Sequence, residues 1–272
     1  MLLPPLLLAE GMAFGSLNVV GMILLEFGLS MDVVRQLRKR EGGKKLHLAG
    51  MAATTFNSIV LGSVTYAVII KYCCVQGPLS LLQQFRSVVL FLGIENTWYY
   101  VMHMAMHTPK LFWMHRFHHK FNAVVLPSSA SAVSVAEFLL AYMAPFLLGS
   151  YLGGTDKSSA IVAAMIVMVA NFFIHTPALE EAMSRLPWIF VRPSDHFAHH
   201  RQLTCNYGAP ILSIDRIMKV MKELMGFYSS ILVQKMESVP SLDCDDSDES
   251  EESDEDAAKE DVAVVEVVKK NL

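Results

Sequence analysis

An uninterrupted run of 23 uncharged residues, 48–70, limits what this chain can fold into. A helix needs roughly 20 predominantly apolar residues to cross the hydrocarbon core of a bilayer, and this run is long enough. Its polar side chains are only those of Thr, Asn, Ser and Tyr. Residues 48–70 therefore predict a membrane-spanning helix.

Four further stretches have the same apolar character, although each is short or contains a polar group. Such groups are tolerated in a membrane helix when they face the interior of a bundle rather than lipid. We therefore predict an all-α, multi-span helical membrane protein with about four to five spans. The last two stretches, joined by "GGTDKSS", form a hairpin that either crosses the membrane or dips into it. The four stretches are residues 12–29, 87–102, about 134–152 and 159–174.

The composition agrees with a membrane protein, because 53% of the 272 residues are hydrophobic and only 18% are charged. The charge is unevenly spread. Residues 243–256 hold ten of the 26 acidic residues, so the rest of the chain has 22 basic against 16 acidic groups. We expect amino-terminal membrane spans over 1–84, a second domain with most of the histidines over 85–225, and an acidic, disordered tail over 226–272.

The loops predict the orientation of the chain. Residues 35–45, "RQLRKREGGKK", contain six Lys or Arg, whereas 71–86 contain two and 151–158 contain one. Because cationic loops stay in the cytosol, five crossings from a lumenal amino terminus place the clustered histidines and the carboxyl terminus there too. The chain also ends in "KKNL". This ending resembles the dilysine signal that vesicle-coat machinery reads on endoplasmic reticulum membrane proteins, so we expect that membrane as the location.

The histidines follow a repeated spacing. H-x-x-H-H occurs at 115–119 and again at 196–200, and H-x-x-x-H occurs at 103–107. On a helix, residues three and four positions apart share a face, so each cluster can present its imidazoles to one point. His47 stands apart, and we expect it to be a surface or hydrogen-bonded core residue. The other nine are His103, His107, His115, His118, His119, His175, His196, His199 and His200.

Nine clustered imidazoles predict a metal site. As cations they would repel one another, and as buried neutral bases without partners they would cost free energy. A divalent metal removes both problems, because neutral imidazole is a common ligand of Zn, Fe, Cu and Ni. One zinc ion needs only three or four protein ligands, so nine indicate two metal ions. The ligand type alone leaves iron and zinc open.

The order of these motifs resembles the fatty acid hydroxylase/sterol desaturase superfamily of integral membrane oxidases, over about residues 85–220. "IENTWYYVMH" is similar to the segment of sterol C4-methyl oxidases before their first histidine box. Asn206-Tyr207 and Asp215-Arg216 also match positions of the family. The chain departs from it at Asn96, where many relatives have Asp, and after His175, where Thr-Pro follows.

The resemblance implies that the nine histidines bind two non-haem iron ions in a cytosolic helical cap, with O2 as co-substrate. Such enzymes hydroxylate, demethylate or desaturate hydrophobic lipids, and we expect a sterol here. The chain has no Gly-rich dinucleotide fingerprint. Electrons would therefore come from NAD(P)H through separate proteins, usually a b-type cytochrome and its reductase in this family. Side chains that could hold the ligand imidazoles are Glu95, Asn96, Asn171, Asp195, Asn206 and Asp215.

Two other functions remain open at this point. A fatty-acyl or isoprenoid-lipid oxidase, including a squalene-type one, would use the same scaffold. A non-catalytic zinc-binding membrane protein would use the same ligands. No motif indicates nucleic-acid binding. The stretch "IMKVMKELMGFYSSILV" (217–233) predicts an amphipathic helix. We expect this helix to pack on the cap, and the alternative is that it lies on the membrane surface.

Overall fold

A computed structural model describes residues 3–122 and 124–237. The chain divides into two units after Leu224, and the first unit contains every helix from α1 to α11 and all ten histidines. The acidic run 243–256 and the terminal "KKNL" lie outside the described residues, as does most of the predicted tail.

The prediction of an all-α, multi-span membrane protein is confirmed. Within the described residues, four helices are long and apolar enough to cross a membrane. Each contains one of the predicted spans, and the second is continuous through α3, η1, α4 and η2. Both helices of the predicted hairpin are long enough to cross. The four candidates are α1 (Pro5–Leu29), α3 to η2 (Gly43–Cys73), α7 to α8 (Val135–Gly153) and α9 (Lys157–Ile174).

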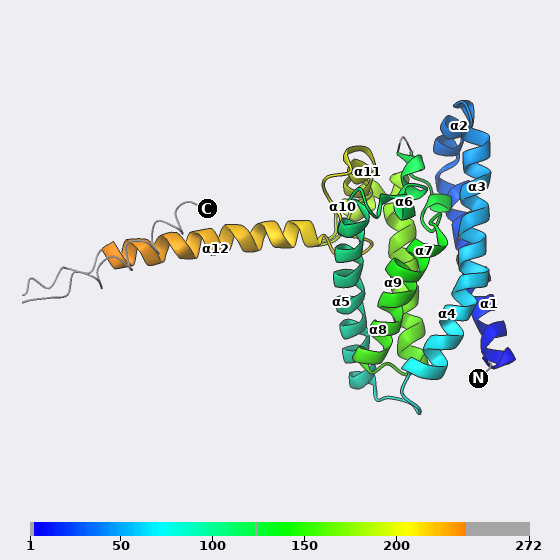
Figure 1. The fold of residues 1–272 in the computed structure, drawn as a ribbon, viewed down its shortest axis with the longest axis horizontal. Coiled ribbons are helices and arrows are strands. Elements are labelled where there is room, and N and C mark those ends of the chain that lie inside the picture. Colours follow the sequence, from blue (N-terminus) through cyan, green and yellow to red (C-terminus); the bar gives the residue numbers. More distant parts are fainter. Residues whose placement is uncertain (1–2, 123, 238–272) are drawn as a thin grey trace, which may run out of the picture. The chain divides into compact units, whose positions relative to one another are not determined.

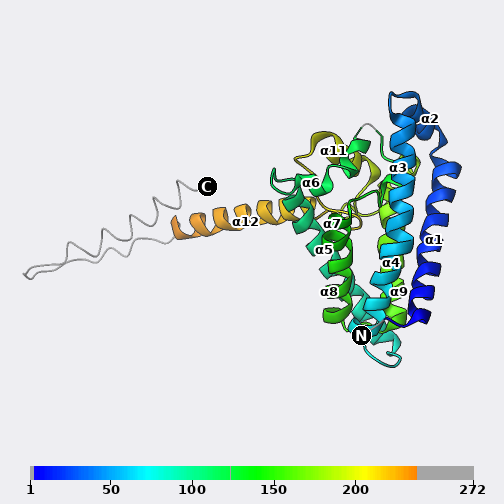
Figure 2. The same cartoon turned by 45° about the vertical axis from the view of Figure 1, so that its right-hand side comes forward.

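The remaining predicted span, 87–102, lies in α5 (Leu81–Met106), which is not among these four candidates. Figures 1 and 2 show that α5 nevertheless runs beside α8 and α9 along the bundle. Glu95 reduces its apolar character, but this side chain is only 2% exposed and accepts a hydrogen bond from Asn96. The polar pair faces the bundle interior, where a membrane helix tolerates it.

Small residues bring the first two spans into close contact. Gly11 and Gly15 form a G-x-x-x-G pattern on α1. A Cβ atom at Gly15 would lie 2.2 Å from the Ser58 carbonyl oxygen, and one at Gly11 would lie 2.7 Å from the Ser63 Cα. Glycine is therefore required at both positions, because apolar helices in lipid associate through close backbone packing rather than through the hydrophobic effect.

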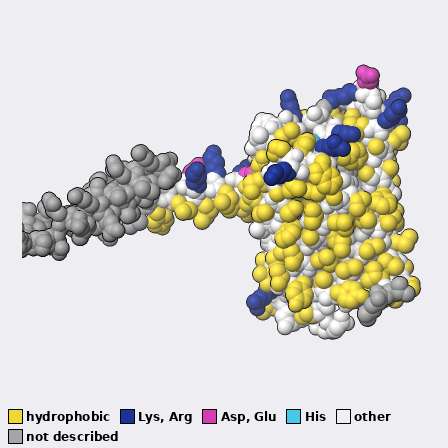
Figure 3. Space-filling view, viewed as in Figure 1, with side chains coloured by type: hydrophobic (Ala, Val, Ile, Leu, Met, Phe, Trp, Pro, Cys, Tyr) yellow, Lys and Arg dark blue, Asp and Glu magenta, His cyan; other side chains and the backbone are white. Residues whose placement is uncertain are grey.

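The predicted basic loop lies at the same end of the bundle as the clustered histidines. Val34 and Leu37 of α2 (Met31–Lys39) pack in one apolar cluster with Phe121 and Val124, which follow the second histidine box. Figure 3 shows Lys and Arg side chains gathered towards this end and an apolar belt over the bundle. The basic loop and the clustered histidines therefore lie at the same end of the bundle, as predicted. That this end faces the cytosol stays a prediction.

His47 is a hydrogen-bonded core residue, as expected for the isolated histidine. Its Nε2 pairs with a Glu26 carboxylate oxygen, and the other oxygen accepts a hydrogen bond from the Ser128 backbone N–H at 2.8 Å. Both side chains are at most 2% exposed. The pair therefore joins α1, α3 (Gly43–Phe56) and the turn at η4 (Pro127–Ser129).

The stretch after Arg216 forms the predicted helix, α12 (Ile214–Glu237). Our expectation that its apolar face packs on the cap is wrong for the residues up to Leu224. Met218, Met221 and Leu224 are 58%, 50% and 48% exposed.

The other elements are η1 (Asn57–Leu61), α4 (Gly62–Val68), η2 (Ile69–Cys73), α6 (Phe112–His115), η3 (His118–Phe121), α7 (Val135–Glu137), η5 (Phe138–Met143), α8 (Ala144–Gly153), η6 (Pro177–Leu179), α10 (Glu180–Ser184) and α11 (Pro193–Gln202).

Candidate metal centre

The nine clustered histidines come from five segments that meet at one end of the bundle. Eight are buried, and His107 is partly exposed. Three of them lie at the ends of the long helices α5 and α9, and the other six lie on the short elements α6, η3 and α11. The end of α5 supplies His103 and His107, α6 supplies His115, η3 supplies His118 and His119, the end of α9 supplies His175, and α11 supplies His196, His199 and His200.

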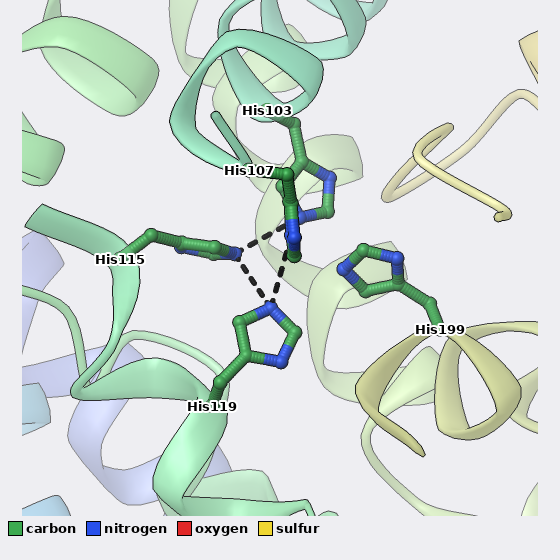
Figure 4. A group of neighbouring side chains, drawn as sticks. All are labelled: His103, His107, His115, His119 and His199. Atoms are coloured by element: carbon green, nitrogen blue, oxygen red, sulfur yellow. Dashed lines mark hydrogen bonds between the residues drawn. The ribbon is translucent and has the colours of Figure 1, made fainter. Parts of the chain in front are cut away.

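The imidazoles form two groups rather than one ring. Within each group, one nitrogen from every residue lies within 4.8 Å of those of the others. The two groups interleave, because neighbours in sequence such as His118 and His119 belong to different ones. Figure 4 shows the rings of the five-histidine group turned towards a common centre. The five-histidine group is His103, His107, His115, His119 and His199, and the four-histidine group is His118, His175, His196 and His200.

The nitrogen–nitrogen distances in the five-histidine group fit a shared ion. The His115 Nε2 lies 3.0 Å from the His103 Nε2 and 2.9 Å from the His119 Nε2. An ion about 2.1 Å from two nitrogens holds them about 3.0 Å apart at octahedral angles and about 3.4 Å apart at tetrahedral angles. A third edge, between the Nε2 atoms of His119 and His107, is 3.2 Å, which lies between these two values. The three edges together fit a shared ion of either geometry.

Hydrogen bonds fix which nitrogen faces the centre. The His103 Nδ1 donates to the Tyr207 carbonyl at 2.8 Å, and the His115 Nδ1 donates to the Glu137 carboxylate at 2.6 Å. Burial and the neighbouring imidazoles hold the pKa of His103 well below its usual value, so this ring is neutral and its Nε2 presents a lone pair. With its proton on Nδ1, a neutral His115 ring presents its Nε2 lone pair to the same point. Two lone pairs that face each other at 3.0 Å cannot form a hydrogen bond and would repel. A cation between them removes this conflict.

His199 completes the group in the same way. Its Nδ1 donates to the Cys205 carbonyl at 2.7 Å, and its Nε2 is buried without a hydrogen-bond partner. Burial lowers the pKa of His199 to about 4, so the ring is neutral at pH 7. A buried, neutral and unpartnered nitrogen that points into a group of imidazoles is a ready metal ligand.

The four-histidine group has the same local chemistry. The His196 Nε2 lies 3.0 Å from the His175 Nε2 and 3.1 Å from the His200 Nε2. The His175 Nδ1 donates to the Asn171 carbonyl at 2.7 Å, so its Nε2 also presents a lone pair. Burial and the neighbouring imidazoles hold the pKa of His200 well below its usual value. This group therefore fits a second ion.

Glu137 is a functional residue that the sequence reasoning did not assign to the histidines. It is fully buried at the start of the α7–η5–α8 helix, where Ser134 accepts a hydrogen bond from its backbone N–H. Its carboxylate fixes His115. The available signal was an acidic residue at the start of an otherwise apolar run, because a carboxylate is tolerated there only with a partner.

None of the six side chains that were expected to hold the imidazoles forms a hydrogen bond to one of them. Asn171 reaches a ligand through its backbone carbonyl, whereas its side chain donates to Ala130 at 3.0 Å. Glu95 bonds Asn96, which accepts a hydrogen bond from the Leu212 N–H at 3.0 Å.

The other three stabilise the segment that runs from α11 to α12. Asp195 forms an ion pair with Arg216, and Asn206 donates to the Asp195 carbonyl at 3.2 Å. Asp215 accepts a hydrogen bond from the Gly208 N–H at 2.7 Å. This segment carries the carbonyls that fix His103 and His199, so these side chains position backbone oxygens rather than imidazoles.

Part of the chain matches a known protein family. Residues 88–220 match the family model described as Fatty acid hydroxylase. The match covers all nine clustered histidines and Glu137, and it supports the superfamily that the motif order resembles. The narrower likeness to sterol C4-methyl oxidases still rests on sequence resemblance alone. Comparisons with curated proteins and with solved structures give no match.

Proposed function

We propose that this protein is a membrane-embedded non-haem di-iron oxidase that uses O2 to hydroxylate, demethylate or desaturate a hydrophobic lipid. The observation that carries the proposal is the pair of Nε2 atoms of His103 and His115, which lie 3.0 Å apart in rings that are each fixed by a hydrogen bond at Nδ1. The family match and the second group of four histidines support it.

The side chains have distinct roles in this proposal. The nine histidines would hold two iron ions, one in each group. Bound iron supplies the activation of O2 and the oxidation of an unactivated carbon. Glu137 keeps the proton of His115 on Nδ1 and so keeps Nε2 free for the metal. Eight of the nine histidines are buried, which limits the access of water to both groups.

The number of ligands in the five-histidine group favours iron over a structural zinc. Five histidines exceed the four ligands of a structural zinc site. Iron, with its larger coordination number, suits this group.

We propose a sterol as the substrate, on the resemblance of "IENTWYYVMH" to sterol C4-methyl oxidases. A fatty-acyl or isoprenoid lipid on the same scaffold is the alternative. The electron donors are proposed to be a b-type cytochrome and its NAD(P)H-dependent reductase, acting from the cytosol. The basic loop 35–45 supports a cytosolic site, and "KKNL" supports retention in the endoplasmic reticulum.

Metal analysis of the purified protein tests the proposal. We expect about two irons per chain and O2 consumption when a reductant and lipid are supplied. Tightly held zinc without turnover would contradict it and favour the non-catalytic alternative. Lipid profiles of cells that lack the protein then identify the substrate, because its precursor accumulates. Replacing Lys269 and Lys270 with Ser tests the location, since unchanged retention would make "KKNL" incidental.

A further inference from the structure

A pocket lies where the end of α2 meets the beginning of α3, next to η3. Its volume is about 550 Å³, which is within the range of about 300–1,000 Å³ for sites that bind small molecules. The apolar side chains that line it include those of Leu37, Leu46, Phe117, Phe121 and Val124. The charged side chains that line it are those of Arg40, Glu41, Lys45 and Lys120. The pocket therefore combines apolar walls with three basic groups and one acidic group.

The three basic groups of the pocket have no acidic partner. Arg40, Lys45 and Lys120 are exposed, and none of them belongs to an ion pair of the described residues. Glu41 does not belong to one either, so it neutralises none of the three. The Lys120 Nζ lies 5.8 Å from the centroid of the Phe117 ring, a contact that leaves its charge uncompensated. The pocket thus holds an excess of positive charge.

The beginning of α3 adds to this charge. No side chain caps the helix at Gly42, and its first turn contains no acidic residue. Lys44 and Lys45 lie in that turn instead. The amino-terminal end of a helix carries a positive partial charge, which acidic side chains or bound anions stabilise and which lysines make less favourable. An anion in the pocket would offset the charges of both the side chains and the helix end.

The pocket lies next to the membrane. The second candidate span begins with α3, and its charge-free run starts at Leu48, three residues after Lys45. At about 1.5 Å per residue, Lys45 lies only about 4.5 Å from this run along the helix axis, which is the level of the lipid headgroups.

This position favours a phosphate group that belongs to a lipid over a dissolved one. Residues 35–45 contain six Lys or Arg and are proposed to face the cytosol. Clusters of about four to eight basic residues at the cytosolic end of a membrane helix typically bind anionic phospholipids. The apolar walls of the pocket would contact the glycerol and the first acyl carbons of such a lipid.

The pocket also adjoins the segment that carries two of the clustered histidines. Phe117 and Lys120 line the pocket, and in the sequence they flank His118 and His119. These two histidines belong to different groups. A ligand in the pocket would therefore contact the segment that supplies one histidine to each group.

We propose that this pocket binds an anionic phospholipid, with its phosphate group held by Arg40, Lys45 and Lys120. The phospholipid is a bound partner and not the molecule that is oxidised. The proposal goes beyond the proposed oxidase function and does not depend on it. It stands on the pocket, on its uncompensated basic groups and on its place beside a membrane span.

The test measures the affinity of the purified, iron-loaded protein in detergent for three probes: dioctanoyl phosphatidic acid, dioctanoyl phosphatidylcholine and inorganic phosphate. The two lipids have the same acyl chains, so a difference between them reports on the headgroup. We expect at least about tenfold tighter binding of the phosphatidic acid, because one hydrogen bond to a charged group accounts for roughly this difference. Equal affinities for the two lipids would overturn the proposal.

Inorganic phosphate tests the source of the anion. It lacks the glycerol and acyl carbons that the apolar walls would contact, so it should bind at least about tenfold more weakly than the phosphatidic acid. Binding as tight as that of the phosphatidic acid would show a site for a dissolved phosphate and would contradict a phospholipid ligand.

Two double variants remove the same charge from neighbouring positions. Arg40→Gln with Lys45→Gln changes two residues that line the pocket, whereas Lys39→Gln with Lys44→Gln changes two that do not. All four side chains are exposed, so both double variants should fold. The first should weaken phosphatidic acid binding by about tenfold, and the second by less than about twofold. Equal losses in the two would show attraction by the surface charge in general and would overturn the proposed site.

Iron content and O2 consumption of the same preparations test the proposed oxidase function separately. A preference for phosphatidic acid without iron or turnover would keep the phospholipid site and contradict the oxidase. Iron and turnover without this preference would keep the oxidase and contradict the phospholipid site.

Discussion

The two histidine groups lie side by side but are supported differently. In the five-histidine group, the Nδ1 atoms of His103, His115 and His199 donate to protein oxygens. In the four-histidine group only His175 does so. The Nδ1 atoms of His118, His196 and His200 are buried without partners, as is that of His119 in the five-histidine group. Because such hydrogen bonds fix ring orientation and raise ligand basicity, the first group is the better prepared for its ion.

The two groups also differ in how far their histidines are exposed. All four residues of the smaller group are buried, whereas His107 of the larger group is partly exposed and lies beside Phe112 and Tyr207. The smaller group supplies fewer ligands and so leaves more coordination positions for other molecules. We therefore expect a tightly held ion in the five-histidine group and a more weakly held one in the other.

The largest expected effect comes from removing one ligand of each group. His199 and His200 are adjacent on α11 but belong to different groups. His199→Ala and His200→Ala should each lower turnover by at least about 100-fold and remove about one iron per chain, because each ion loses a ligand. His118→Ala should behave like His200→Ala. Iron analysis and turnover measurements check this, and membrane insertion should be unchanged.

A variant that retains full activity, or that keeps both irons, would break the assignment of these histidines. Loss of both irons from every single variant would show instead that the two groups act as one site.

Glu137→Gln should have the next largest effect. Glutamine cannot keep the negative charge beside His115, so affinity for the ion of the five-histidine group should fall by about 10- to 100-fold. The other ion should be unaffected. Glu95→Gln is the control, because Glu95 is equally buried but bonds Asn96. Titration of the metal-free protein with iron measures both, and equal losses in the two variants would contradict a specific role of Glu137.

Chelation of the iron should show a smaller difference between the two groups than the Glu137→Gln substitution does. An excess of an iron chelator should release one ion several-fold faster than the other, because only one of four rings in the smaller group is fixed at Nδ1. In the Glu137→Gln variant the two rates should approach each other. Single-phase release in the unmodified protein would show that the difference in support has no energetic consequence.

Asp195→Asn should have the smallest effect. It weakens the ion pair with Arg216, which helps to hold the segment that supplies the Tyr207 and Cys205 carbonyls. The pair is partly exposed, so a loss of only a few-fold in affinity for the first ion is expected. Asp32→Asn removes the exposed ion pair with Arg35, which lies outside the segment from α11 to α12, and should change neither affinity. An effect of Asp195→Asn on the second ion alone would contradict this account.

The sequence predicted the helices and the clustering of the histidines for a physical reason. A charge-free run such as 48–70 has few stable conformations besides a helix in lipid, and it lies within the helix Gly43–Cys73. The H-x-x-H-H spacing marked the histidines that meet at one end of the bundle, but the expectation that each box points to one centre is wrong. His115 lies in α6 and His118 and His119 in η3, and both boxes contribute to both groups.

The hydrogen bonds around the ligands were not predictable in the same way. The oxygens that fix His103, His175 and His199 belong to the backbone, which every residue carries, so residue identity gives no signal. Glu137 differs, because its position in an apolar run did mark it as a side chain in need of a partner. The π-helical stretches η1, η2 and η5 depend on tertiary packing, which hydrophobic periodicity does not report.

The most direct test of the central claim is a structure of the iron-loaded protein with anomalous scattering measured at the iron edge. The account predicts two separate iron peaks. One should be surrounded by His103, His107, His115, His119 and His199, and the other by His118, His175, His196 and His200. A single peak shared by both groups, or iron bound elsewhere with these imidazoles turned away, would contradict it.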